Sequence, residues 1–199
     1  MMTGIGILES DDLAWNSFML ANRAMYMQRI HLLIQSAMSN EDRYDGDELL
    51  DTVLEDLEYD DAETTINELL ASVNSSMKFR DPTWRPFQLA FMLMSVKSIV
   101  LDNLGDNNSE RDIVDLIWFP TGGGKTEAFL GIMVFNLFFD RIRGKECGVT
   151  AILKYPLRLL SVQQVQRVSN ILASAELIRR DNLPGGDRFA LGYFVGEHK

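Results

Sequence analysis

Apolar residues recur at near-helical spacing along much of the chain. In the first such stretch, from Asp11 or Asp12 to about Met38, the spacing places apolar side chains on one face of a helix. Asp11 and Asp12 stand where an N-terminal cap with a favourable negative charge is expected. The same reasoning predicts helices over five further stretches: Leu49–Leu57, Ala62–Val73, Phe87–Leu101, Glu127–Arg143 and Leu157–Arg180.

Short apolar runs between the later helices predict strands, at residues 113–118, 148–154 and 189–195. Because these runs alternate with helices, the pattern predicts an α/β fold with a three-layer parallel sheet. The apolar run from Ala128 to Phe139 is expected to be a helix buried inside the sheet-and-helix core. Asp81–Pro86 marks the boundary between a mainly helical region, residues 1–80, and the α/β part, residues 81–199.

The composition is that of an ordinary globular protein, with 46% apolar and 24% charged residues among 199. No apolar stretch is long enough to cross a bilayer, and the N-terminus lacks the pattern of a secretory signal, so no membrane association and a cytoplasmic location are expected. Cys147 is the single cysteine, and His31 and His198 are far apart in sequence. Neither an internal disulfide nor a metal cluster is therefore expected.

The net charge of −10 is unevenly distributed along the chain. Residues 1–110 hold 20 acidic and 7 basic residues, whereas residues 111–199 hold 9 acidic and 12 basic residues. The acidic half repels nucleic acid and is better suited to docking a protein partner. Asp45 and Asp47 have the spacing of calcium ligands, but the rest of an EF-hand loop is absent, so a solvated acidic face is favoured.

The segment Phe119-Pro120-Thr121-Gly122-Gly123-Gly124-Lys125-Thr126 has the pattern of a phosphate-binding loop (P-loop). Glycines let backbone N–H groups surround an anion, and the following helix adds its positive end. In such a loop Lys125 contacts the β- and γ-phosphates of ATP, and the Thr126 hydroxyl binds Mg²⁺. Glu127 completes the candidate nucleotide-binding set and favours the helix start through its charge. Phe119 departs from the usual Gly or Ala, and the alternative is a glycine-rich turn with an incidental Gly-Lys-Thr.

Upstream, Arg85-Pro86-Phe87-Gln88 resembles the adenine-reading segment of superfamily 2 helicases. A glutamine amide has one donor and one acceptor end, which match the N7 and N6 groups of adenine. Arg85 and Gln88 are therefore candidate nucleotide-binding residues, with Trp84 or Phe87 stacking on the base. The alternative is a helix start with Pro86 in the first turn and aromatic side chains in the core.

Downstream, Tyr155–Gln164 resembles helicase motif Ia, with Leu157 in place of the usual Thr. In those helicases the motif holds the phosphate backbone of one nucleic-acid strand, which implies this role for Pro156, Arg158 and Gln163. Arg158 suits it as a permanent cation with a forked set of donors. An ordinary turn with an exposed arginine is the alternative.

Together these motifs, in helicase order from Trp84 to Gly196, resemble the N-terminal part of a superfamily 2 (DEAD/DEAH-like) helicase. The sequence between these motifs resembles that of the large helicases of DISARM phage-defence systems. The resemblance implies part of a RecA-like P-loop domain, ATP and Mg²⁺ as cofactors, and single-stranded nucleic acid, DNA favoured, as a partner.

The acidic DExH-type box and the second motor domain of such helicases are missing, so no catalytic residue is predicted within this chain. Two other readings stay open: an unrelated P-loop NTPase, and a non-enzymatic interaction module with a vestigial P-loop.

Overall fold

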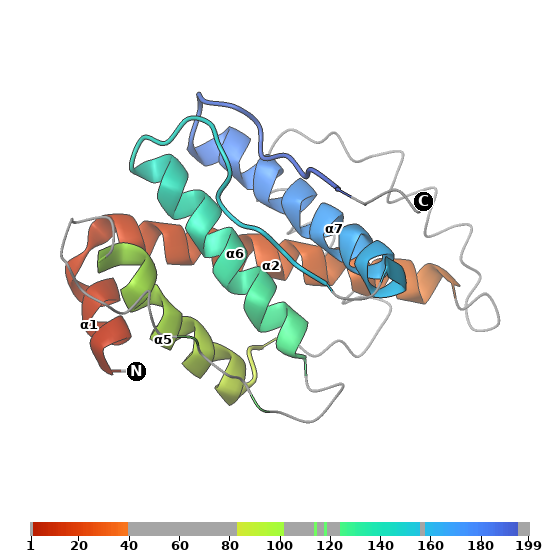
Figure 1. Cartoon of the computed structure of the whole chain (residues 1–199), viewed down its shortest axis with the longest axis horizontal. Coiled ribbons are helices and arrows are strands. Elements are labelled where there is room, and N and C mark those ends of the chain that lie inside the picture. The colour runs from red at the N-terminus through yellow and green to blue at the C-terminus, as the bar shows by residue number, and fades with distance from the viewer. Residues whose placement is uncertain are drawn as a thin grey trace.

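The computed structural model describes residues 2–39, 83–101, 114, 118, 124–155 and 158–194. Within these ranges the chain forms helices and no strand (Figure 1). The helices are α1 (Met2–Ser10), α2 (Asp12–Ser39), α5 (Pro86–Leu101), α6 (Lys125–Ile142) and α7 (Arg158–Asn182). The helical predictions for α2, α5, α6 and α7 are thereby confirmed. Those for Leu49–Leu57 and Ala62–Val73, and the reading of Asp45 and Asp47, lie outside the described residues.

The predicted α/β fold with a three-layer, RecA-like parallel sheet is wrong for the described residues. Residues 148–154 and 189–194 belong to no helix or strand, and no backbone hydrogen bond joins these two described segments. Apolar side chains that a sheet would bury are in solvent: Val149 and Ile152 are each 74% exposed, and Phe194 is 95% exposed. Of the run 113–118, only Val114 and Trp118 are described, and both are exposed. An apolar run predicts burial, but a strand also needs a neighbouring backbone to pair with, and the described residues supply none.

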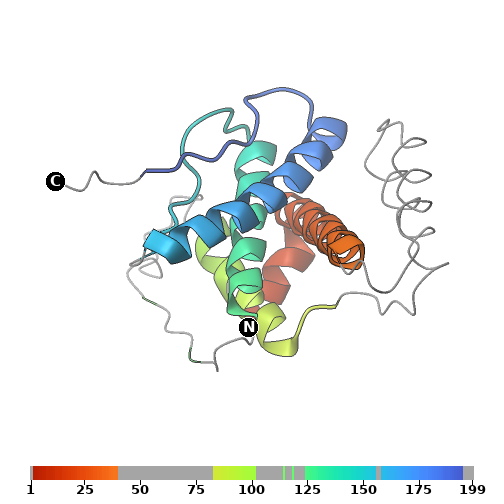
Figure 2. The ribbon, with the colours of Figure 1, turned by 90° about the vertical axis from the view of Figure 1, so that its right-hand side faces the viewer.

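Helix α6 lies at the centre of the fold and packs against α2, α5 and α7. Figure 1 shows it crossing α2, with α5 and α7 on its two sides, and Figure 2 shows the same arrangement turned by 90°. Phe135 and Phe138 of α6 are fully buried, together with Ile30 of α2 and Ile178 of α7. The apolar run Ala128–Phe139 is thus a buried helix as expected, but other helices cover it instead of a sheet.

A helix cap and a close helix–helix contact help to position the N-terminal helices. Oδ1 of Asp11 accepts hydrogen bonds from the backbone N–H groups of Leu13 (2.9 Å) and Ala14 (3.0 Å), so Asp11 caps α2 as predicted. Helix α1 was not predicted. It packs against α5 so closely at Gly4 that an added Cβ would lie 1.8 Å from the carbonyl oxygen of Leu93.

In the part of the chain that is described, no group of His, Cys, Asp and Glu side chains is arranged to hold a metal ion. No helix there has the length and apolar character needed to span a bilayer.

Candidate phosphate-binding site at the start of helix α6

Helix α6 begins immediately after a glycine in the left-handed conformation. Gly124 has φ 86° and ψ 29°, which an L side chain adopts only with strain, and α6 starts at Lys125. No side chain caps this helix start, and Lys125, Thr126 and Glu127 form its first turn. The first N–H groups of a helix have no partner within the helix, so this end is suited to an anion. Pro120, Thr121, Gly122 and Gly123 lie outside the described residues.

Gln88 connects the predicted adenine-reading segment to this helix start. Its Nε2 donates a hydrogen bond to the carbonyl oxygen of Gly124 (2.7 Å), although the two residues are 36 positions apart in sequence. Its Oε1 accepts a hydrogen bond from the backbone N–H of Arg85 (2.8 Å). The side chain is buried, with 5% of the residue exposed. The structure therefore brings two of the predicted segments together.

The same contacts give Gln88 a structural role as well. Pro86 is the first residue of α5, and Gln88, in its third position, reaches back to the residue before the helix, as in a capping box. Each end of the amide already has a protein partner, so in this conformation neither is directed to a base. Arg85 is exposed at the helix start.

Trp84 is part of the packing and not a free stacking surface. Its Nε1 donates a hydrogen bond to Oδ1 of Asn22 on α2 (2.6 Å). A Cβ added at Gly131 of α6 would lie 3.0 Å from the far edge of its ring. Gly131 therefore makes room for Trp84, and the aromatic ring joins α2 to α6.

Arg167 of α7 forms an ion pair with Glu127 of α6, through Nη2 and Oε1. The two side chains are 36% and 39% exposed. The other oxygen of Glu127 lies 3.5 Å from the position of a Cβ at Gly124, so the carboxylate folds back over the start of α6. Sequence reasoning did not select Arg167, because nothing in its local pattern distinguishes it from other polar residues on the exposed face of a helix.

The nucleic-acid candidates lie at the start of α7. Arg158 is the first residue of this helix, and Gln163, about a turn and a half later, is exposed. Pro156 lies outside the described residues.

A buried carboxylate stands at the far end of α6. Asp140 accepts hydrogen bonds from Lys145 Nζ (2.6 Å), Thr150 Oγ1 (2.8 Å) and Arg143 Nη2 (2.5 Å). Burial raises the pKa of Asp140, but these hydrogen bonds outweigh it and leave the pKa below its ordinary value of 3.8. The contacts hold residues 143–150 against the end of α6.

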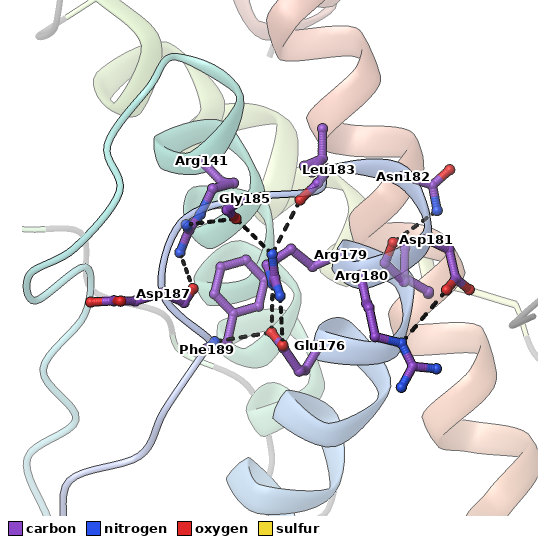
Figure 3. Close-up of polar contacts among 11 residues, drawn as sticks. Arg141, Glu176, Arg179, Arg180, Asp181, Asn182, Leu183, Gly185, Asp187 and Phe189 are labelled. Atoms are coloured by element: carbon purple, nitrogen blue, oxygen red, sulfur yellow. Dashed lines mark hydrogen bonds and ion pairs between the residues drawn. The ribbon is translucent and has the colours of Figure 1, made fainter.

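A second cluster of polar side chains holds the turn that follows α7 (Figure 3). Arg179 donates to the carbonyl oxygens of Leu183 (3.1 Å) and Gly185 (2.8 Å), and it pairs with Glu176. Glu176 also accepts a hydrogen bond from the backbone N–H of Phe189 (3.0 Å). Burial raises the pKa of Glu176, but the hydrogen bonds from Arg179 and Phe189 leave it below its ordinary value of 4.5. Sequence reasoning missed both clusters, since each is assembled by folding.

The described residues thus define a helical protein whose central helix begins with Lys-Thr after a left-handed glycine. The chain is similar to "DISARM protein DrmA" of Bacillus paralicheniformis, with 38% identity over 138 residues. The match covers 65% of this chain and 12% of the relative, so the chain spans a small part of that protein's length. This similarity agrees with the predicted resemblance to DISARM proteins. No family model and no solved structure matches it.

Proposed function

We propose that this chain serves in phage defence as part of a DISARM component, and that it binds the phosphates of ATP at the start of α6. The similarity to the DISARM protein supports the first half of this proposal. The hydrogen bond from Gln88 to Gly124 carries the second half, because it joins two segments that were each selected as nucleotide-binding by their residues alone.

The residues at the start of α6 fit the chemistry of a magnesium nucleotide. The helix start lacks a side-chain cap, so its N–H groups and its positive dipole end favour phosphate oxygens. Lys125 supplies a cation in the first turn, and the hydroxyl of Thr126 supplies the kind of oxygen ligand that Mg²⁺ prefers. Gln88 acts by holding the Gly124 peptide in place.

The resemblance to superfamily 2 helicases extends the proposal to the longer protein. There, ATP would drive movement along single-stranded nucleic acid, with DNA favoured. Arg158 and Gln163, at the start of α7, are the proposed contacts to its phosphates, together with Pro156. No residue of this chain is assigned to catalysis of hydrolysis.

Titration calorimetry with Mg²⁺–ATP tests the phosphate site. We expect Lys125→Ala to weaken binding at least about tenfold, because a charge-assisted contact to phosphate is lost. Lys154→Ala is the matched control, since Lys154 is an exposed lysine of the segment 148–155, and it should leave affinity unchanged. Equal effects of the two variants would refute the site.

The role of Gln88 is tested by comparing ATP with GTP. If the amide only holds Gly124, Gln88→Ala weakens both nucleotides by the same factor. A loss confined to ATP would show instead that the amide turns to the base and reads adenine.

Salt-dependent binding of single-stranded DNA tests the start of α7. Arg158→Ala should weaken all sequences alike and reduce the slope of log affinity against log salt by about one. Arg180→Ala, at the other end of the same helix, is the control and should leave the slope unchanged. A sequence-dependent loss, or none, would contradict the assignment.

A further inference from the structure

The ion pair between Glu127 and Arg167 places a second cation beside the proposed phosphate site. Glu127 is the third residue of α6, and one oxygen of its carboxylate lies near Gly124 while the other binds Arg167. One carboxylate therefore links the guanidinium of Arg167 to the start of α6. Arg167 comes from α7, 40 positions further along the chain.

The carboxylate of Glu127 lies near Gly124, beside the helix start where the proposed anionic ligand would bind. A negative side chain in the first turn is favourable while the site is empty, because it complements the positive end of the helix. It becomes unfavourable when a polyphosphate arrives, since like charges are then brought together.

The ion pair is of a kind that exchanges easily. Both side chains are more than a third exposed, and exposed pairs contribute little to stability. Phosphate, in contrast, accepts two parallel hydrogen bonds from a guanidinium and carries more charge than a carboxylate. The balance favours transfer of Arg167 from Glu127 to a bound phosphate.

We propose that Arg167 is a phosphate-binding residue of this site, and that Glu127 holds it next to the helix start until a nucleotide polyphosphate takes it over. This inference rests on the proposed function. It assigns α7 a direct part in nucleotide binding, in addition to the residues of α5 and α6.

The test is whether the two partners of the ion pair have opposite effects. Arg167→Ala should weaken Mg²⁺–ATP about tenfold, because a charge-assisted contact is removed. Glu127→Gln should tighten binding by about threefold, since it releases Arg167 and removes a negative charge that repels phosphate. A threefold change corresponds to the free energy that an exposed ion pair contributes. Arg180→Ala, an exposed arginine of the same helix, is the matched control and should change nothing.

Two further measurements identify phosphate as the group that Arg167 contacts. Inorganic tripolyphosphate, used as the probe, should lose affinity on Arg167→Ala by the same factor as ATP. Arg167→Lys should recover part of the loss, because lysine keeps the charge but not the forked geometry.

A purely structural ion pair gives a different result: Glu127→Gln and Arg167→Ala would then weaken binding alike, which would overturn the inference. Absence of any effect of either substitution, while Lys125→Ala still weakens binding, would also overturn it and leave the proposed function standing. Binding that Lys125→Ala does not affect would refute the proposed function itself.

Discussion

Arg179 and Glu176, one turn apart on α7, face each other through two hydrogen bonds, Nε to Oε2 at 2.7 Å and Nη2 to Oε1 at 2.8 Å. The side chain of Arg179 is only 8% exposed, and its remaining donors bind the carbonyl oxygens of Leu183 and Gly185. Arg141 of α6 reaches the same turn from the other side and lies over the ring of Phe189, 5.5 Å from its centroid (Figure 3). The guanidinium groups of Arg179 and Arg141 thus together hold the turn that follows α7.

Arg179→Ala should lower the free energy of unfolding by about 2–4 kcal/mol, because a partly buried carboxylate and two carbonyl groups each lose a hydrogen bond from Arg179. Arg180→Ala is the neighbouring control, with a side chain that is 58% exposed, and should cost less than about 0.5 kcal/mol. Urea unfolding monitored by circular dichroism measures both. Similar losses for the two variants would contradict the role assigned to Arg179.

Asp140 should contribute to the pH dependence of stability. Its pKa in the folded chain lies below the ordinary 3.8, so its contribution is fully present above that pH and is lost as the pH falls through the lowered value. Asp140→Asn should therefore cost about 2 kcal/mol near neutral pH, since hydrogen bonds from charged groups are lost. The difference from the unsubstituted chain should shrink below pH 3.8.

Thermal melts between pH 2 and pH 7 give this comparison. Asp187→Asn is the control, because Asp187 is exposed and its contact with Arg141 is made by the backbone carbonyl. A difference between Asp140→Asn and the unsubstituted chain that did not change with pH would count against the assignment.

Alanine substitutions at Gly4 and Gly6 of α1 should change the free energy of unfolding in opposite directions. A Cβ at Gly4 would meet the backbone of Leu93, whereas nothing lies within 4 Å of a Cβ at Gly6. Gly4→Ala should cost about 1–3 kcal/mol by overpacking the contact between α1 and α5. Gly6→Ala should stabilise the chain by up to about 1 kcal/mol, because alanine favours the helix. Urea unfolding of both variants shows whether α1 packs as described.

Gly124 and Gly144 make a second matched pair, since both have positive φ, 86° and 94°. Alanine at Gly144 meets no neighbouring atom, but alanine at Gly124 would lie 2.7 Å from Nε2 of Gln88. Gly144→Ala should cost about 1–2 kcal/mol for the left-handed backbone alone. Gly124→Ala should cost about 1 kcal/mol more, because it displaces a hydrogen bond. Equal losses in urea unfolding would show that Gln88 does not depend on Gly124.

Helices α2, α5, α6 and α7 could be predicted to within a few residues because their determinants are local. Asp11 caps α2, Pro86 opens α5, and Gly124 precedes α6, each within one turn of the helix it delimits. Helix α1 escaped prediction because it is nine residues long and contains two glycines, and its packing on α5 outweighs its weak propensity.

The apolar runs at residues 148–154 and 189–194 show the limit of such patterns. Short apolar runs indicate strands, but the pairing of a strand depends on a partner that can be remote in sequence. Lys125 and Thr126, which we propose to contact phosphate, could be selected from the order of amino acids, since a glycine followed by a helix start is a local feature. Two contacts arise only when α5, α6 and α7 pack together: the hydrogen bond from Gln88 to Gly124 and the ion pair of Arg167 with Glu127. Each contact joins residues more than 30 positions apart in the chain.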